Sequence, residues 1–508
     1  MIISRFVHFV ALGLAASSAS LAGPSVATIT SEARKALAID AFATRADAFT
    51  MRGKARLFSI EQDAQLSFDR DGHVVLSLDG KLPLSRAYDG TSCWAADYGT
   101  PPQTMTLSEH NTMRVLGSVV SGTWTAADGP LAFAEPKDES PNLLEWTLRE
   151  TGTKGTLTLD DTRHPVALTI GSGRSAHKYE LSDWRPLDGT PVPTAITFSS
   201  GANESIEMRF TGATRSTNDV FSRQHARASL ARFYSSVSPS LEVKKLAVGL
   251  VLVKPTINGQ QPGWFIFDTG AGATVLDAAT AKDLNIDAFG EIQVGGVGGA
   301  VASPILLPES LTLGPVTIER PMVITLDLAM ISAAIKEKIV GIVGYDVLSR
   351  VITVYDKAEG RIELHDPSTY NAVHNWQTLF IFGRRPHVEA ELEGHKGVFM
   401  LDTGANSALT VHAPAVRKFN MLEGRTMTEG KVGGSGGIVT VKRGEVRDLV
   451  LAGKKYPKLK AEFAITEGDS FDDEDAFGNI GAGVIKDFVL VLDYTRERIS
   501  LVPHAASK

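Results

Sequence analysis

The sequence is poor in cysteine, because Cys93 is the only one among 508 residues. A single cysteine forms no internal disulfide, so stability must come from hydrophobic cores rather than from covalent cross-links. Cys93 stands beside Trp94 in the stretch GTSCWAADYG, and no activating histidine can be placed next to it from the sequence. We therefore expect a buried, inert thiol rather than a catalytic nucleophile.

Long apolar runs are also missing after the first residues, so we expect no membrane-spanning segment. The N-terminus contains, in order, the positive charge of Arg5, an apolar stretch at 6–16 and the small-residue sequence SLA at 20–22. This order is typical of a secretory signal peptide. We expect residues 1–22 to be removed by cleavage near Ala22, and the mature protein to be periplasmic or secreted.

No long basic run occurs, and the formal net charge is -7. This balance argues against nucleic acid or an anionic membrane surface as the partner. Hydrophobic residues make up 43% of the chain and charged residues 21%, which is globular composition. A chain of 508 residues exceeds one ordinary core, so we expect about three folded domains.

The first half of the chain has a period of two, as in LLEWTLRE and SIEMRF, with turn clusters such as DRDG, ETGTKG and PLDGTP between the runs. This rhythm predicts a meandering antiparallel sheet with one buried face. We assign residues 23–235 to this domain and expect helices at 31–46 and 222–237. The latter helix would lead into the second half.

The second half repeats itself. FIFDTGA recurs as FMLDTGA, which places Asp268 and Asp402 134 residues apart. VGGVGG recurs as VGGSGG, and Gly344 recurs as Gly481 at an offset of 137. Three landmarks in one order at nearly one offset indicate an internal duplication. We therefore expect two related β-barrel lobes, at 236–366 and 367–508.

The Asp-Thr-Gly turns carry the chemistry. In each copy the aspartate follows an apolar strand, the threonine can bond to nearby backbone, and the glycine permits a turn that side chains would block. The result is a carboxylate presented from a rigid element. One such turn is also good structural turn chemistry, so a single copy does not decide between the two interpretations.

A duplication tends to place equivalent segments around a twofold axis. If the turns meet there, Asp268 and Asp402 face each other and cannot both be ionised, because each charge raises the pKa of the other group. The pair would share one proton, hold a water and act as general base and general acid on a peptide carbonyl. No metal, cofactor or covalent intermediate is needed, and we expect none.

Both copies resemble the retropepsin-like aspartic peptidases in a single-chain, duplicated form. DTGAGATVL follows the DTGAxxTVL pattern of that family, and IVGYDVL at 342–348 is similar to its apolar-apolar-Gly element. The resemblance implies that Asp268 and Asp402 are the dyad, and that Thr269, Gly270, Thr403 and Gly404 support it. It also implies two flaps closing over the substrate, built from Gly295, Gly296, Gly298, Gly299, Gly433, Gly434, Ser435, Gly436 and Gly437.

Two departures weaken the symmetry. The second copy reads DTGANSALT and lacks the threonine that Thr274 supplies in the first, and Asn479 stands at an apolar position.

Ser435 fits a G-x-S-x-G nucleophile pattern literally, but a strand-like run follows it instead of a helix. The acidic stretch at 467–478 does not have the spacing of an EF-hand. A solvated loop, a weak metal site or a lip for cationic peptides remain open for it.

The N-terminal half shows no acid pair or metal cluster. Its turns, including YDGTSCW at 88–94, loosely resemble the LolA-like lipoprotein carriers, which are curved antiparallel sheets with an apolar concave face. The resemblance implies a surface for an acyl chain or an apolar peptide. A spacer or an inhibitory partner of the peptidase half is the alternative.

We therefore expect a mainly β protein: a curved antiparallel sheet with flanking helices, then two pseudo-twofold-related lobes. The expected function is an exported aspartic endopeptidase acting on a peptide or protein substrate, as a monomer. The competing interpretation is a non-catalytic envelope protein that binds peptide or lipid on the same fold. A third is an enzyme that stays latent until its N-terminal half is removed.

Overall fold

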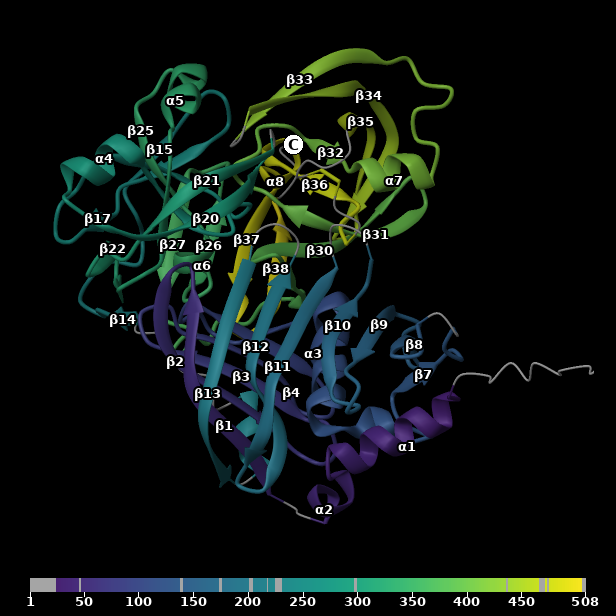
Figure 1. The fold of residues 1–508 in the computed structure, drawn as a ribbon. Helices are drawn as coiled ribbons and strands as arrows, with labels where there is room; N and C mark the ends of the chain where they lie inside the picture. The colour runs from purple at the N-terminus through teal and green to yellow at the C-terminus, as the bar shows by residue number, and fades with distance from the viewer. Residues whose placement is uncertain are drawn as a thin grey trace, which may run out of the picture.

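The computed structural model is mainly β, as the sequence predicts (Figure 1). The residues that it describes are 24–44, 47–137, 140–172, 176–200, 204–216, 218–223, 231–296, 299–434, 437–465, 471–472 and 475–504. The expected signal peptide at 1–22 lies outside them. Within the described residues, no helix has the length and apolar character needed to cross a membrane.

The N-terminal domain is built on one antiparallel sheet. Its strands are β1 (Ala48–Leu57), β2 (Ile60–Phe68), β3 (Val74–Asp79), β4 (Leu84–Tyr88), β5 (Cys93–Asp97), β6 (Gln103–Thr104), β7 (Leu131–Phe133), β8 (Leu143–Leu148), β9 (Lys154–Leu159), β10 (Pro165–Ile170), β11 (His177–Leu187), β12 (Thr190–Ser200) and β13 (Glu204–Ser216). Neighbours in the sheet are neighbours in sequence except where β1 pairs with β13, which joins the β2–β6 half to the β7–β12 half.

Three helices accompany this sheet: α1 (Val26–Ala36), α2 (Ile39–Ala43) and α3 (Leu107–Ser121). The expected helix at 31–46 begins earlier and breaks at Ala38, which has a left-handed backbone (φ 51°). The sequence analysis missed α3. Its start is a capping box, in which the side chains of Thr106 and Glu109 each accept from the backbone amide of the other residue.

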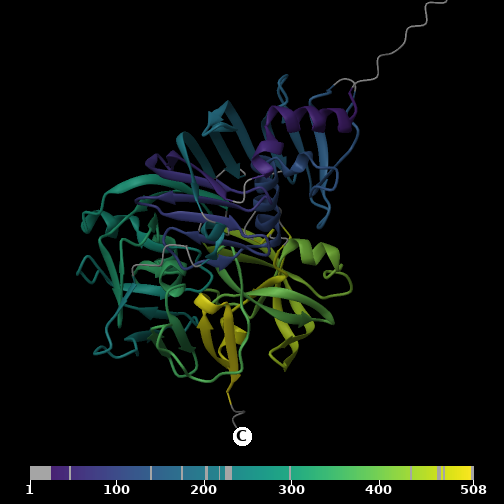
Figure 2. The same cartoon turned by 90° about the horizontal axis from the view of Figure 1, so that it is seen from below.

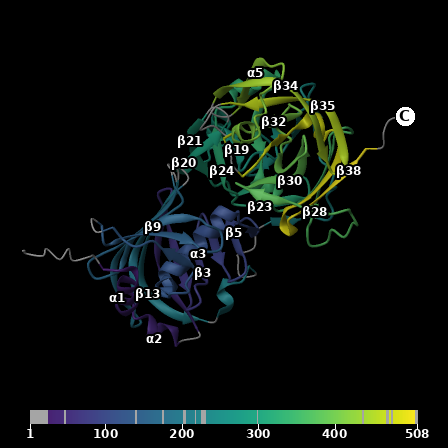
Figure 3. The same cartoon turned by 90° about the vertical axis from the view of Figure 1, so that its right-hand side faces the viewer.

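Helix α3 lies in the bend of the sheet. It contacts strands of both halves, including β4 and β10, so the sheet curves around it (Figure 3). Its apolar residues, such as Val115, Leu116 and Val119, are buried in the same core as Phe49 and Phe210 of the sheet. Cys93 is buried here as well, and burial raises the pKa of its thiol, as expected for an inert cysteine.

The rest of the chain forms two lobes. The first contains β14 (Ala231–Phe233), β15 (Val243–Lys245), β16 (Val251–Val253), β17 (Thr256–Ile257), β18 (Trp264–Phe267), β19 (Thr274–Asp277), α4 (Ala278–Asp283), β20 (Ala288–Gly296), β21 (Gly299–Leu306), β22 (Ser310–Leu313), β23 (Val316–Glu319), β24 (Val323–Leu326), α5 (Ala329–Ile335), β25 (Ile339–Val343), α6 (Tyr345–Leu348), β26 (Ile352–Asp356) and β27 (Arg361–His365).

The second lobe contains β28 (Gln377–Thr378), β29 (Phe380–Phe382), β30 (Arg385–Leu392), β31 (His395–Leu401), β32 (Leu409–Val411), α7 (Ala413–Lys418), β33 (Thr428–Gly434), β34 (Gly437–Leu451), β35 (Lys454–Ala464), β36 (Gly478–Ile480), α8 (Ala482–Ile485), β37 (Phe488–Asp493) and β38 (Arg498–Pro503).

Each lobe has an eight-stranded sheet, and the two sheets agree position by position. Their orders are β15-β16-β18-β25-β19-β24-β21-β20 and β29-β30-β31-β36-β32-β35-β34-β33. In both, the strand before the Asp-Thr-Gly turn runs parallel to the strand of the later glycine element: β18 to β25 and β31 to β36. In both, the next strand pairs antiparallel with that same element.

A five-stranded sheet, β27-β26-β37-β38-β28, joins the two lobes. At its centre, β26 and β37 run antiparallel, and Val354 pairs with Val491. These two residues are 137 positions apart, which is the offset of the sequence repeat at this point. Residues separated by the offset of the sequence repeat therefore pair directly with each other in this sheet.

The connection into the first lobe differs from the expected helix at 222–237. Residues 224–230 lie outside the described part of the chain, and Ala231–Phe233 forms strand β14, paired with β23. The helix prediction is therefore wrong for these three residues, because pairing at the edge of a sheet satisfies their backbone.

The N-terminal domain contacts both lobes (Figures 1 and 2). Glu497 of the second lobe accepts from the amide of Thr104 at 2.6 Å and pairs with Arg223 at 2.5 Å. Arg350 of the first lobe donates to the carbonyl of Gly99 at 2.8 Å. These bonds fix the position of the N-terminal domain against the lobes.

Candidate active site

The two aspartates of the repeat occupy equivalent positions at the ends of equivalent strands. Asp268 follows β18, and its amide donates to the carbonyl of Val343 at 3.1 Å. Asp402 follows β31, and its amide donates to the carbonyl of Ile480 at 3.0 Å. Each turn is thus held by the strand that lies parallel to it. Both carboxyl groups are partly exposed.

The structure brings the two turns together. A methyl group placed on Gly404 would lie 2.4 Å from the carboxyl carbon of Asp268, and one on Gly270 would lie 2.7 Å from that of Asp402. Both distances are shorter than any side-chain contact, so each glycine is required for the close approach of the opposite carboxyl group. The carboxyl group of each aspartate therefore lies against the turn of the other aspartate.

Thr269 and Thr403 lock the turns across the interface between the lobes. The amide of Thr269 donates to Oγ1 of Thr403 at 2.9 Å, and the reverse bond is 3.0 Å. Each hydroxyl then donates to a carbonyl of the opposite lobe, that of Leu401 at 2.6 Å or that of Phe267 at 2.9 Å. Both threonines are fully buried, so these bonds are shielded from water.

Burial raises the pKa of both carboxyl groups, and at Asp268 the charge of Asp402 raises it further. Desolvation is the larger cause at Asp268, the charge of Asp402 is the second, and together they raise the pKa of Asp268 to about 8. Desolvation also raises the pKa of Asp402. Two acids in this environment retain a shared proton at neutral pH.

The pair is not symmetric in its hydrogen bonds. Oδ1 of Asp402 accepts from the amides of Gly404 and Ala405, both at 2.9 Å. Oδ1 of Asp268 accepts from Gly270 at 2.7 Å. Arg385 adds a positive charge that lowers the pKa of Asp402. These contacts favour the ionised form of Asp402.

A buried acid that the sequence analysis missed supports the first turn. Oδ2 of Asp346 accepts from the amide of Thr274 at 2.6 Å, and burial raises the pKa of Asp346. The buried Arg350 donates to the carbonyl of Asp346. A charged residue directly after the apolar-apolar-Gly element, in GYD, was the available signal. The second copy has Gly483 at this position, so the support exists in one lobe alone.

The two sequence departures have local compensations. The amide of Gly344 donates to Oγ1 of Thr274 at 3.3 Å, whereas the equivalent amide of Gly481 donates to the carbonyl of Ala408 at 3.1 Å. Asn479 is buried, and its side-chain oxygen bonds to Nε2 of His412 at 2.8 Å. A polar residue is therefore accommodated in the core of the second lobe.

The glycine-rich segments are the tips of two hairpins. In the first lobe, β20 pairs with β21 up to the residue pair Gly296 and Gly299. In the second lobe, β33 pairs with β34 up to the residue pair Gly434 and Gly437. Each hairpin belongs to the sheet that carries the aspartate of its lobe. Of the expected flap residues, Gly295, Gly296, Gly299, Gly433, Gly434 and Gly437 are described, and Gly298, Ser435 and Gly436 lie outside the described residues.

Other candidate groups do not gather at this site. Among the described residues, no three His, Cys, Asp or Glu side chains lie close enough together to hold one metal ion. The acidic stretch at 467–478 is described in part: Phe471 is buried and Asp472 pairs with Arg417 at 3.2 Å.

Residues 253–347 match the family model described as aspartyl protease. The first lobe therefore contains an aspartyl protease domain. The matched range includes the Asp268 turn, the β20–β21 hairpin and β25, so it covers the first copy of the repeat. No curated protein matches the chain.

Proposed function

We propose that the protein is an exported aspartic endopeptidase in which Asp268 and Asp402 form one catalytic dyad. The observation that carries this proposal is the contact of each turn glycine with the opposite carboxyl group. A pair of carboxyl groups at that distance shares one proton, which provides a general acid and a general base in one place. The aspartyl protease domain of the first lobe supplies half of the pair.

The asymmetry of the pair assigns the two roles. Asp402, with two amide donors and the charge of Arg385, is the base that removes a proton from a water. The water oxygen attacks the peptide carbonyl carbon while Asp268 gives its proton to the carbonyl oxygen. Asp402 then passes its proton to the amide nitrogen, the C–N bond breaks, and Asp268 recovers a proton from the geminal diol. Atoms and charges balance without a metal or a covalent intermediate.

The second lobe is, in this proposal, a duplicate of the first in a retropepsin-like arrangement. Three observations support it: the equal strand orders of the two sheets, the pairing of Val354 with Val491, and the reciprocal bonds of Thr269 and Thr403. The hairpins β20–β21 and β33–β34 are then the two flaps. Closure of such flaps excludes water from the reaction.

The location and the role of the N-terminal domain also belong to the proposal. The signal-like N-terminus supports a periplasmic or secreted enzyme. The curved sheet around α3 supports a LolA-like domain in this proposal. The proposed ligand of that domain is an acyl chain or an apolar peptide.

The direct test is incubation of the mature full-length chain with a mixed peptide library, followed by mass spectrometry of the products. New termini that appear only with active protein, and that disappear when a statine-containing peptide is added, support the proposal. Binding of peptides without any cleavage, at every pH tested, would contradict it and favour the non-catalytic binding protein.

A further inference from the structure

Two turns of the N-terminal sheet reach the first lobe close to the proposed active site. One is the β1–β2 turn at Phe58–Ser59, and the other is the segment Asp97–Thr100 after β5. They lie against each other, because the rings of Phe58 and Tyr98 are 6.4 Å apart. Both aromatic residues have left-handed backbones, with φ of 48° and 53°.

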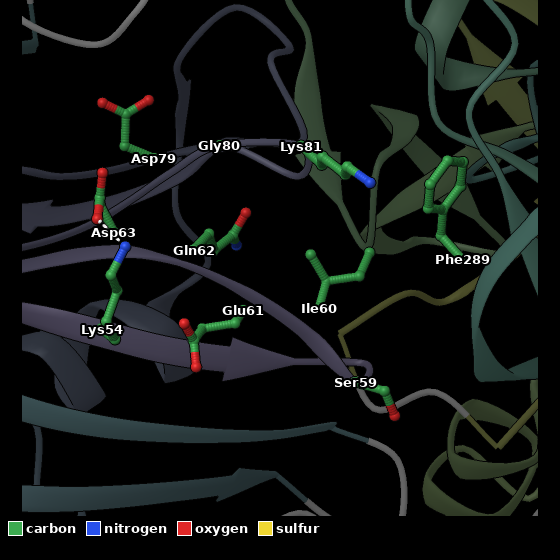
Figure 4. Close-up of a pocket in the computed structure, with 10 residues that line it drawn as sticks. All are labelled: Lys54, Ser59, Ile60, Glu61, Gln62, Asp63, Asp79, Gly80, Lys81 and Phe289. Atoms are coloured by element: carbon green, nitrogen blue, oxygen red, sulfur yellow. Dashed lines mark hydrogen bonds and ion pairs between the residues drawn. The ribbon is translucent and has the colours of Figure 1, made fainter.

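The first turn contacts the strand that leads into a flap. A methyl group on Gly290 of β20 would lie 2.2 Å from the carbonyl oxygen of Phe58, so the two backbones touch. Beside this contact, Nζ of Lys81 lies 4.2 Å from the ring centre of Phe289. A hollow of about 480 Å³ is lined by residues of the N-terminal sheet and by Phe289 (Figure 4).

The second turn contacts the floor beside the dyad. Asp97 pairs with Arg384 of the second lobe at 3.7 Å, and the guanidinium of Arg384 lies 4.7 Å from the ring centre of Tyr98. The side chain of Arg384 starts against Gly272, four residues after Asp268: a methyl group on that glycine would lie 3.9 Å from its Cβ and 3.1 Å from the carbonyl of Gly383.

Helix α6 gives the second turn another contact with the floor. The amide of Tyr345 in this helix donates to the carbonyl of Ala271 at 3.0 Å, and Arg350, two residues after the helix, donates to the carbonyl of Gly99 at 2.8 Å. The apolar contact is continuous as well. The core of the N-terminal domain forms one cluster with Ile266, two residues before Asp268, and with Ile342.

At the opposite end of the site, the described residues form no such cover. The residue equivalent to Gly272 is Asn406, which is exposed. Val248, in the turn between β15 and β16 that corresponds to the turn of Arg384, is 39% exposed. Thr428 of β33, the residue equivalent to Gly290, is exposed as well. The two ends of one pseudo-symmetric site therefore differ in what covers them.

From this asymmetry we propose that the N-terminal domain is an end wall of the substrate cleft and limits how far a peptide extends on one side of the scissile bond. The inference rests on the proposed function. The wall spans from the flap strand, at Gly290, to Arg384, whose side chain starts against Gly272 on the floor. It stops short of the dyad, since both aspartates remain partly exposed. The substrates are then peptides that end within a few residues of the cut on the walled side and run freely on the other.

The test uses the full mature chain and one cleavable peptide core, extended stepwise with alanine on its N-terminal or its C-terminal side. Wild type should lose about tenfold or more in kcat/KM beyond a short extension on one side, and change little with extension on the other. Binding of statine-containing peptides of the same nested lengths is measured by calorimetry in parallel, so the length limit is read even without turnover.

Tyr98→Gly and Phe58→Gly open the wall while keeping the left-handed backbone that glycine accepts. Each should restore cleavage or binding of the long peptides toward the value for the short ones. The matched control is Arg320→Gly, which changes an exposed residue with φ of 46° in the same lobe as the floor. It should leave the length limit unchanged. Thermal melting confirms that each variant is folded.

Equal tolerance of extension on both sides would overturn the wall. The proposal would also be overturned if wild type cleaved no peptide of any length and Tyr98→Gly cleaved them. In that case the N-terminal domain would block the whole site rather than one end of the cleft. A one-sided length limit in statine-peptide binding without cleavage would uphold the wall and contradict the peptidase function instead.

Discussion

Thr269 and Thr403 bond to each other twice, each through its own amide and the hydroxyl of the other, at 2.9 and 3.0 Å. They are equivalent residues of the repeat, 134 positions apart. Because each hydroxyl also donates into the opposite lobe, one buried network ties the two aspartate turns to each other. Two fully buried threonines thus hold the two aspartate turns together.

Replacing either threonine should therefore loosen the lobes against each other. We expect Thr403→Ala to lower the free energy of unfolding by about 2–4 kcal/mol, because two hydrogen bonds are lost and buried partners are left unsatisfied. Peptide cleavage should fall with it. Chemical denaturation and kcat/KM measure the two effects.

Thr403→Ser is the matched control, since serine keeps the hydroxyl in the same position. It should stay within about 1 kcal/mol of wild type, the transfer free energy of one methyl group. If Thr403→Ala were as stable as Thr403→Ser, the network would have no structural role.

A prediction was confirmed where its sequence pattern alone determines the secondary structure, and it was wrong where distant contacts determine it. The period of two in the first half predicts strands, and the strands form, because alternation is a local property. Helix α3 was missed because its buried face contains Asn111, Thr112 and Ser118, so its apolar pattern is weak. The helix expected through Ala231–Phe233 is a strand, because the deciding contact, with β23, comes from far along the chain.

At the site, the repeat identified Asp268 and Asp402 as candidates, because the same Asp-Thr-Gly motif occurs twice after an apolar run. The side chains that distinguish the two copies could not be foreseen. Asp346 supports one lobe alone, and Arg385, at the start of β30, acts on Asp402, which follows the neighbouring strand β31. Both contacts depend on how the strands pair and pack, which the repeated motif does not encode.

Removal of either carboxylate should stop catalysis. Asp268→Asn and Asp402→Asn should each lower kcat by at least about 100-fold, because the general acid or the general base is lost while the shape is kept. Cleavage of a quenched fluorescent peptide measures the effect, and circular dichroism confirms the fold. Asp277→Asn, at the cap of α4 in the same lobe, is the control and should stay active. Full activity in either dyad variant would refute the mechanism.

The raised pKa of Asp268 predicts the alkaline limit of activity. The dyad works with one proton. Because the pKa of Asp268 is about 8, this proton is kept at neutral pH and lost above about pH 8. We expect kcat/KM to persist through neutral pH, to decline above about pH 8, and to decline again in acid where both carboxyl groups are protonated. A profile without an alkaline decline would contradict a shared proton.

The same pKa predicts that Asp268→Asn stabilises the protein. The unfolded chain releases this proton near pH 3.8 and the folded chain near pH 8, so the folded state binds it more tightly. Below pH 3.8, Asp268 therefore does not lower the free energy of unfolding of wild type. As the pH rises toward 8, it lowers that free energy progressively. At pH 8 we expect an advantage of about 2 kcal/mol for the variant, reduced by the partial exposure of the group. The difference between the two melting temperatures should grow with pH, and a constant difference would argue against the shift.

The glycines of the two turns give the sharpest steric test. A methyl group on Gly404 would lie 2.4 Å from the carboxyl carbon of Asp268, so Gly404→Ala must displace that carboxyl group or separate the turns. We expect a loss of about 100-fold or more in kcat, since a displacement of about 1 Å is sufficient for this. Gly295→Ala is the matched control, because a methyl group there meets no atom within 4 Å even though the residue lies on a proposed flap. It should retain cleavage within a few-fold of wild type. Comparable activity in the two alanine variants would mean that the carboxyl group of Asp268 does not need its place against Gly404, and the dyad would have to be assigned elsewhere.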